Sequence, residues 1–175
     1  FLESMLGRDK SFRNLIYLDP AGEINAAVSR QSHVLSDKFI QQIDQDMVSR
    51  FKQTRRYISP VSIDPQTYEP LVTLSVWSTN IFGDFRGLLA VEVNLKFIWM
   101  LVDKLKIGET GQSYVVDKNG TLLAAKDISR VIRGESIAHI SKVREFIRQA
   151  SSNQSIEASI FKGMHGTKVV GTAVG

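Results

Sequence analysis

The feature that most constrains this chain is an internal duplication. The segments YLDPAGEINAA (17–27) and VVDKNGTLLAA (115–125) share an Asp, a Gly and an Ala-Ala pair at equal spacing, 98 positions apart. At the same offset, PLVTLSV (70–76) falls on KVVGTAV (168–174). An offset shared from residue 17 to residue 76 predicts two homologous modules of roughly one hundred residues each.

Each copy of the repeated segment is expected to form a β-hairpin. Asp19 opens the turn DPAG and Asp117 opens DKNG. In such turns Asp bonds to the backbone of its own turn, and Gly adopts the left-handed conformation. Turn geometry accounts for both aspartates, and DKNG lacks the further oxygen ligands of a calcium loop. We therefore predict no metal-binding or catalytic role for either residue.

The rest of the first module combines a helix with three strands. Apolar residues recur at helical spacing over 35–53, which predicts an amphipathic helix. Strands separated by turn-forming segments are expected at 56–63, 70–79 and 86–93. Asn94 is placed to cap a helix over 95–105. We expect this helix to be a buried connector whose apolar stripe consists of Ile98, Leu101, Val102 and Leu105.

The second module repeats this order but ends earlier. After its hairpin, a helical stretch is expected near 136–151, followed by strands in SIEASIF (155–161) and GTKVVGTAV (166–174). A counterpart of the strand at 86–93 is not found. We therefore expect the sequence to be a fragment that stops about one strand before its second module closes, which would leave an exposed sheet edge.

Together these elements predict an α+β fold of two tandem PAS-like modules. Each module is an antiparallel sheet of about five strands with flanking helices, and the second module is truncated. The expected boundaries are a first module at 1–94, a connecting helix at 95–108 and an incomplete second module at 109–175.

Composition excludes several classes of function. The net charge of +4 is only a mild basic bias, and the absence of cysteine excludes disulfides and thiolate metal sites. The longest apolar run, FIWMLV (97–102), is far shorter than the ~20 residues of a membrane-spanning helix. No HExxH, GxSxG, GxGxxG or Gly-Lys-Ser/Thr motif is present, so we expect no catalytic residue, metal or cofactor. The one compact basic cluster, RRY (55–57), is too small to predict nucleic-acid binding.

The order YISPV, YEPLVTLSV, GDFRGLLAVEVNL and IGETGQSYVVDKNGTLLA resembles the double Cache domains of bacterial and archaeal receptors. The resemblance covers almost the whole chain, and GETGQSYVVDKNG with the preceding GDFRG and VEVNLKFI is its most specific part. It implies that 1–94 is a membrane-distal module and 109–175 a membrane-proximal one, both outside the cytoplasm.

By the same resemblance, the chain is the ligand-sensing input domain of a transmembrane receptor, with a sensor histidine kinase of a two-component system as the favoured full-length protein. The implied partners are a small-molecule ligand, the transmembrane helices and cytoplasmic output domain of the same chain, and a second copy in a homodimer. The chain departs from the family where Trp77 stands in place of a frequent proline. TRRYIS (54–59) also lacks the Trp-Tyr pair of the amino-acid-sensing subset, so no amino-acid ligand is carried over.

The expected ligand site lies on the strand at 70–79. Thr73, Ser75 and Trp77 share one face of this strand. Their counterparts in the second module are Gly171, Ala173 and Gly175. An aromatic wall with a few polar groups is typical of a small-molecule pocket. The alternative is a solvated sheet face, because antiparallel sheets often have one wet side, with Trp77 packed against a neighbouring element.

Further candidates border this strand, namely Arg55, Arg56, Tyr57, Ser59 and Asp84. Arginine suits a bidentate grip on a carboxylate or phosphate, which favours a small anionic ligand, and Tyr57 and Ser59 would face the same way. The resemblance implies an acidic ligand contact in the region of Asp84. Alternatively, the arginines lie on the surface or at a helix end, and Asp84 is a turn residue.

Two functions from different classes follow from the sequence. The first is a ligand-sensing input domain. The second is a non-sensing spacer or dimerisation module with the same fold. The Thr73, Ser75 and Trp77 face separates them, because a closed pocket packed by Trp77 would favour the spacer.

Overall fold

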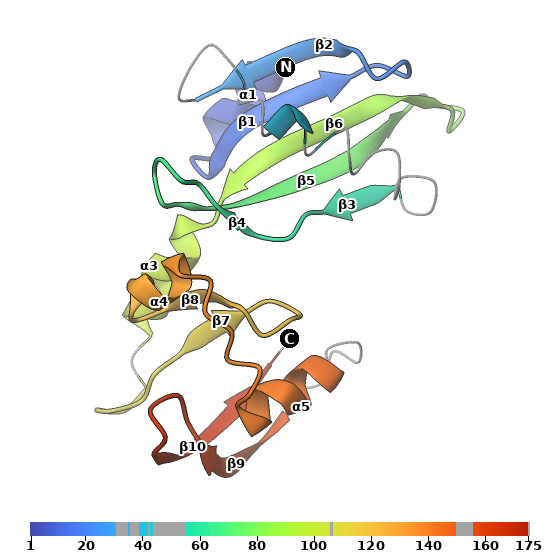
Figure 1. Cartoon of the computed structure of the whole chain (residues 1–175). Coiled ribbons are helices and arrows are strands. Elements are labelled where there is room, and N and C mark those ends of the chain that lie inside the picture. Colours follow the sequence, from blue (N-terminus) through green and yellow to red (C-terminus); the bar gives the residue numbers. More distant parts are fainter. Residues whose placement is uncertain are drawn as a thin grey trace. The chain divides into compact units, whose positions relative to one another are not determined.

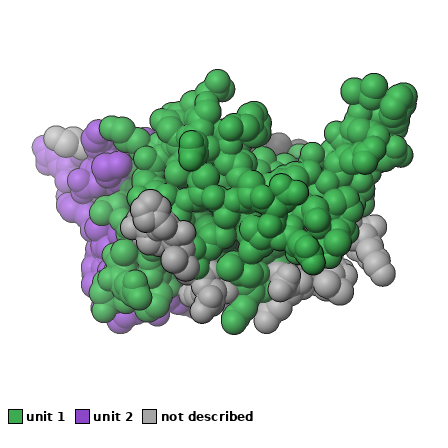
Figure 2. Space-filling view, turned by 90° about the horizontal axis from the view of Figure 1, so that it is seen from above, with its two compact units in different colours: residues 1–97 green, residues 98–175 purple. Residues whose placement is uncertain are grey.

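The computed structural model covers residues 1–175 and describes 1–30, 35, 39–41, 43, 55–105, 107–149 and 156–174. The chain divides into two compact units, Phe1–Phe97 (unit 1) and Ile98–Gly175 (unit 2), which are drawn in different colours in Figure 2. Both units combine antiparallel strands with a few helices, which confirms the α+β fold class.

Unit 1 is built on one antiparallel sheet with the strand order β2-β1-β6-β5-β3, in which β4 also pairs with β5 (Figure 1). Its elements are α1 (Leu2–Arg8), β1 (Phe12–Leu18), β2 (Ile24–Ser29), β3 (Arg56–Ile58), β4 (Ser62–Ile63), β5 (Pro70–Thr79) and β6 (Phe85–Asn94). The predicted strand at 56–63 is therefore two short strands, because Pro60 between them has no amide hydrogen to donate to the sheet.

The two faces of this sheet differ in what lies against them. One face carries Ile16, Leu18, Leu88 and Ala90, which are buried together with Tyr57, Phe39 and Ile43. We call it the covered face. Residues 39–41 and 43 are helical, and the remainder of the helix predicted over 35–53 lies outside the described residues, apart from position 35. On the opposite face, Leu15, Val72 and Val93 are buried, while Val76 is half exposed.

Unit 2 repeats the hairpins of unit 1. Its elements are β7 (Tyr114–Val116), β8 (Leu122–Ala125), α4 (Ile128–Ile132), α5 (Ser141–Gln149), β9 (Ile156–Lys162) and β10 (Lys168–Ala173). β7 pairs with β8, and β9 pairs with β10. In the part of unit 2 that the structure describes, no strand joins β7 to β10, whereas β6 joins their counterparts β1 and β5 in unit 1.

The duplicated hairpins match in detail. In β1–β2, Tyr17 pairs with Ala26, and the register shifts before Leu18. In β7–β8, Val115 pairs with Ala124, and the register shifts before Val116. Since these positions correspond at the offset found in the sequence, the two hairpins share both register and bulge.

The turns of the two hairpins also share their chemistry. Asp19 Oδ1 accepts from the amides of Ala21 and Glu23, and Asp117 Oδ1 accepts from those of Asn119 and Thr121. Gly22 and Gly120 have φ values of 87° and 79°, a conformation that favours glycine. The predicted turn roles of both aspartates are thus confirmed.

The helix α3 (Lys96–Lys104) runs from the end of unit 1 into unit 2. Asn94 Oδ1 accepts from the Lys96 amide at 2.8 Å, as the predicted cap requires. The predicted apolar stripe is wrong in part, because Leu101 and Leu105 are 57% and 50% exposed. Trp99 and Val102 are the buried residues, and the Trp99 indole donates to the carbonyl of Leu123.

The core of unit 2 gathers α3, the β7–β8 hairpin and both following helices. Its buried residues are Trp99, Val102, Leu122, Ala124, Ala125, Val131, Ile137, Ile140 and Val143. α5 lies within the stretch predicted near 136–151, whereas α4 was not expected from the sequence. α4 is a short helix that Asp127 caps by accepting from the Ser129 amide.

Candidate functional site

The covered face of unit 1 changes from apolar to polar along its strands. In strand register, Trp77 of β5 stands beside Leu88 of β6, and Ser75 stands beside Ala90. Further along, Thr73 pairs with Glu92, which pairs in turn with Asn14 of β1. One end of the covered face is thus a row of polar side chains that crosses three neighbouring strands.

The predicted residues of β5 lie on this face and are mostly buried. Thr73 and Ser75 are each only 3% exposed, so their side of the strand is not the solvated face that the sequence allowed as an alternative. Trp77 is partly buried against the apolar cluster of the covered face. Its ring centroid lies 4.9 Å from that of Phe85, with the rings tilted by 53°.

Two further candidates come from the edge of the sheet. Tyr57 is buried on β3, and its backbone pairs with that of Ser75. The Ser59 hydroxyl accepts from the Thr73 amide at 2.8 Å and donates to the Pro60 carbonyl at 2.9 Å. Ser59 therefore holds the edge of the sheet together where Pro60 interrupts it.

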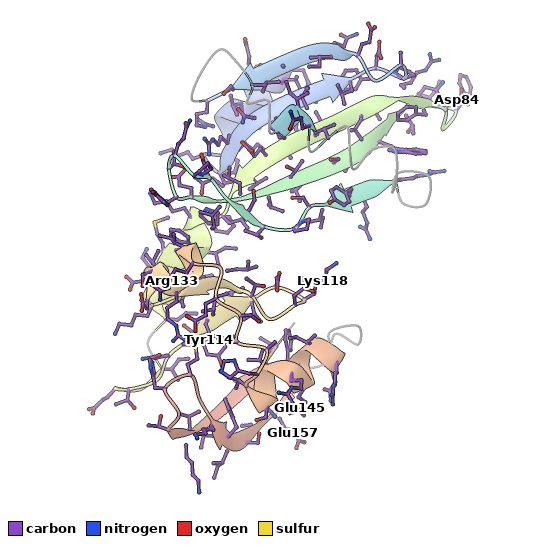
Figure 3. The ribbon with its side chains drawn as sticks, in the orientation of Figure 1. Asp84, Tyr114, Lys118, Arg133, Glu145 and Glu157 are labelled. Atoms are coloured by element: carbon purple, nitrogen blue, oxygen red, sulfur yellow. The ribbon has the colours of Figure 1, made fainter. Side chains whose placement is uncertain are left out.

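The charged candidates lie elsewhere. Arg55 and Arg56 are exposed, and Arg56 pairs with Val76, whose side chain lies on the opposite face from Ser75. Asp84 is exposed at the tip of the β5–β6 hairpin (Figure 3), where it accepts from the Asn80 side chain. The structure thus brings Tyr57, Thr73, Ser75 and Trp77 to one face and leaves the two arginines and Asp84 exposed.

A buried charged cluster that was not predicted from the sequence lies at the polar end of the covered face. This cluster, which we call the polar cluster, consists of Arg13, Asn14, Asp64 and Glu92. Asn14, Asp64 and Glu92 are less than 9% exposed. Asn14 Nδ2 donates to Glu92 Oε2 at 2.6 Å, and Arg13 Nε lies 3.8 Å from the same oxygen. Arg13 Nη1 lies 2.5 Å from Asp64 Oδ2, but its N–H bonds are not aligned with that oxygen, so this contact is an ion pair.

Asp64 is held in its ionised form. Burial alone would raise the pKa of its carboxyl group. The Gln66 amide and the Thr67 hydroxyl donate hydrogen bonds to this carboxylate, and Arg13 forms an ion pair with it. Together these contacts outweigh burial and set the pKa of Asp64 below the ordinary value of 3.8. Asp64 is therefore a carboxylate at neutral pH.

One signal in the sequence could have revealed Glu92. In β6, Leu88, Ala90 and Glu92 alternate with Leu89, Val91 and Val93, so Glu92 is in phase with two small or apolar residues of the covered face. A charged residue in that phase of a central strand is unusual. Arg13 and Asp64, by contrast, come together only through the fold.

Unit 2 has no matching polar row on β10. At the positions of Thr73 and Ser75 it carries Gly171 and Ala173. A Cβ atom on Gly171 would lie 3.0 Å from Phe161 Cε1, so the Phe161 ring occupies the space beside this glycine. Unit 2 does contain an open hollow of about 470 Å³ beside the end of α3. Its lining residues are Val102, Asp103, Leu105, Ile107, Gly108, Glu109, Gly111, Gln112, Ser113 and Lys126.

Neither a metal centre nor a membrane span is found among the residues that the structure describes. Within them, no three His, Cys, Asp or Glu side chains gather as metal ligands. None of their helices has the length and apolar character needed to cross a bilayer.

Comparison with known proteins gives similarity in structure but not in sequence. No protein-family model matches the chain, and no curated protein matches it. Among solved structures, the sensory domain of the Campylobacter jejuni chemoreceptor Tlp3 with isoleucine bound is similar, with a TM-score of 0.63 and 15% identity over 93% of this chain and 61% of that chain.

Two further solved structures share the fold. The extracellular domain of mmHK1S-Z2, named as a histidine kinase, has a TM-score of 0.69 and 11% identity over 96% of this chain and 72% of its own. The ligand-binding domain of the Pseudomonas aeruginosa amino acid chemoreceptor PctC in complex with GABA has a TM-score of 0.57 and 16% identity. That match covers 74% of this chain and 55% of the PctC chain.

The chain thus spans about three fifths of the length of the chemoreceptor domains that it matches. Its fold is that of the Cache-type sensory domains of chemoreceptors and of a histidine kinase, as the resemblance in sequence implied.

Proposed function

We propose that this chain is a ligand-sensing input domain from the extracytoplasmic part of a transmembrane receptor, and that unit 1 binds a small molecule at the covered face. The observation that carries the proposal is the burial of polar side chains on that face. An apolar core needs no hydroxyls or carboxylates, and burying them costs free energy unless they are hydrogen-bonded. Thr73, Ser75 and Glu92 are buried side by side on this face, and Glu92 accepts a hydrogen bond from Asn14.

The charges on the covered face indicate the class of ligand. In the described part of the polar cluster, two carboxylates face one guanidinium, so the formal charge is negative. Arg55 and Arg56 are exposed, so they do not neutralise this negative charge inside the covered face. We infer a ligand with an ammonium or similar donor group, in place of the anionic ligand that the arginines suggested. Isoleucine and GABA, bound by Tlp3 and PctC, both carry such a group.

A thermal-shift screen of amines and amino acids against the full chain tests this function. A compound present at one hundred times its dissociation constant adds ~2.7 kcal/mol of stability and raises the melting temperature of the unit that binds it. The Glu92→Gln variant should lose the response. Glu23→Gln, which removes an exposed carboxylate from a turn of the same unit, should keep it. A response that survives in Glu92→Gln contradicts the assignment of the site.

The whole receptor follows from the same proposal. Neighbouring helices of the same chain would carry the signal across the membrane to a cytoplasmic output domain, with a histidine kinase favoured. A homodimer is the expected assembly. The contribution of this chain is recognition, and the chemistry of the output belongs to other parts of the receptor.

One observation favours the second candidate, a non-sensing spacer with the same fold. Trp77 packs on Phe85 and on the apolar cluster, as a side chain that fills a core would. If Trp77 has only this role, Trp77→Ala lowers stability by about 3–5 kcal/mol and no compound stabilises the wild type. If Trp77 also lines the ligand site, Trp77→Ala abolishes the thermal shift that a compound causes, whereas Arg56→Ala leaves that thermal shift unchanged.

A further inference from the structure

The loop between β4 and β5, residues 64–69, contacts both the polar cluster and the start of α3. At one end, Asp64 forms the ion pair with Arg13. At the other end, Glu69 accepts from Asn94 Nδ2 at 2.6 Å and lies 3.4 Å from Lys96 Nζ. A short segment therefore connects the covered face with the first turn of the helix that leads into unit 2.

Hydrogen bonds within the loop connect its two ends, so a movement of one end is expected to move the other. Asp64 donates its amide to the Glu69 carbonyl at 2.9 Å and accepts from the Tyr68 amide at 2.8 Å. Its side chain accepts from the Gln66 amide and the Thr67 hydroxyl. Tyr68 has a φ of 56°, which is costly for an aromatic residue and persists only where its surroundings impose it. A change at Asp64 therefore acts on Glu69 through direct bonds.

α3 is the covalent link between the units and is held in both. In unit 1, Asn94 caps it, and the Leu95 amide donates to the Pro70 carbonyl at 2.8 Å. In unit 2, Trp99 is buried and donates its indole N–H to the Leu123 carbonyl at 2.7 Å. The Asn94 side chain, which caps the helix, is the same one that Glu69 holds.

We propose that the 64–69 loop couples the state of the covered face to α3. The proposal rests on the proposed function, because it names how that site regulates the rest of the chain. A ligand cation that pairs with Glu92 and Asp64 displaces Arg13, and Asp64 then exchanges its ion pair with Arg13 for one with the ligand. Glu69 moves together with Asp64, and this movement changes its hydrogen bond with Asn94, the residue that caps α3. The ligand acts by favouring one of two loop arrangements.

A double-mutant cycle followed by amide hydrogen exchange tests this coupling without a ligand. Glu92→Gln removes one of the two carboxylates of the polar cluster, and Glu69→Gln weakens the contact with Asn94 and Lys96. The readouts in the full chain are the exchange rates of the Leu95 and Lys96 amides and of the Trp99 indole N–H. Glu92→Gln should change these rates by roughly 2- to 30-fold, and in the Glu69→Gln background it should change them no further.

Glu23→Gln is the matched control and should leave all three rates unchanged. Asp64→Asn perturbs the loop directly, and it replaces Glu92→Gln if that variant does not fold. Equal effects of Glu92→Gln with and without Glu69, or no effect on α3, overturn the coupling. Because the cycle contains no ligand, a negative result contradicts the coupling but does not test ligand sensing, which the thermal-shift screen tests separately. Conversely, a screen in which no compound binds does not contradict a coupling that the double-mutant cycle has shown.

Discussion

At the scale of single residues, the polar cluster is expected to affect both the stability of unit 1 and its recognition of a ligand. Arg13 neutralises part of the charge of Asp64 and Glu92, and Asn14 supplies a donor to Glu92. Paired in this way, the carboxylates are tolerated where isolated charges would be very costly. Each member of the cluster is therefore expected to matter for folding as well as for binding.

Asp64 should give unit 1 a stability that depends on pH. Because folding lowers the pKa of Asp64, its carboxylate stabilises the fold above the ordinary pKa, and this contribution is lost as pH falls through the folded-state value. Asp64→Asn should lower the free energy of unfolding by about 1–3 kcal/mol at pH 7, and the loss should shrink below pH ~3. Urea unfolding, followed by Trp77 fluorescence in a Trp99→Phe background, measures it.

The exposed Asp84 provides the comparison for this variant. Asp84→Asn should change the free energy of unfolding by less than ~0.5 kcal/mol at either pH. If Asp64→Asn proves equally harmless at pH 7, the ion pair with Arg13 contributes nothing to the fold.

The duplicated turns supply a second test at a single position. Gly22 and Gly120 both have positive φ, but a Cβ atom on Gly22 meets nothing within 4 Å, whereas one on Gly120 would lie 2.8 Å from the Ala138 Cβ. Gly22→Ala should cost about 1–2 kcal/mol of backbone strain. Gly120→Ala should cost about 1–3 kcal/mol more because of overpacking. Chemical denaturation of each unit checks the order, and equal losses would contradict it.

At the scale of elements, local chemistry explains what could be predicted from the sequence. The hairpins follow from Asp and Gly at fixed positions in their turns, and the cap of α3 follows from Asn94. The apolar stripe of α3 was misassigned because the helix buries Trp99 and Val102 and leaves Leu101 and Leu105 half exposed. Periodicity gives a helix, but which side is buried depends on what packs against it.

Only the part of the candidate site that lies on a single strand could be predicted from the sequence. Thr73, Ser75 and Trp77 alternate along β5, so their common face could be read from the sequence. The contact between Arg13 and Asp64 joins β1 to a distant loop, and no local pattern encodes it. Arg55 and Arg56 are exposed, which residue type alone could not predict.

Asn94 permits a test of how α3 begins. Asn94→Ala removes both the cap and the bond to Glu69, and should lower the free energy of unfolding by about 0.5–2 kcal/mol. Asn94→Ser keeps an acceptor for the Lys96 amide but replaces the amide donor to Glu69 with a shorter hydroxyl, so it should recover most of this loss. Circular dichroism during urea unfolding gives the values. A Ser variant as unstable as the Ala variant would mean that the Glu69 contact dominates.

At the scale of the whole molecule, each unit has its own buried core and its own tryptophan. Trp77 belongs to unit 1 and Trp99 to unit 2. Among the residues that the structure describes, each unit has its own buried apolar cluster and therefore its own source of stability. A single melting temperature is therefore not expected to describe the chain.

Single-tryptophan variants should reveal two unfolding transitions. Trp99→Phe leaves unit 1 as the fluorescent unit, and Trp77→Phe leaves unit 2. The two urea midpoints should differ, and a compound that binds the covered face should move the unit 1 midpoint more than that of unit 2. Coincident midpoints in both variants would indicate that the chain unfolds as one cooperative body.

The matching hairpins also have an evolutionary and practical consequence. Register, bulge and turn chemistry are the same in both copies, whereas the facing side chains of β5 and β10 have diverged. Scaffold and specificity are thus encoded by different residues. A library that randomises Thr73 and Ser75 of β5, and leaves the two duplicated hairpins β1–β2 and β7–β8 untouched, should yield folded proteins with new chemical preferences.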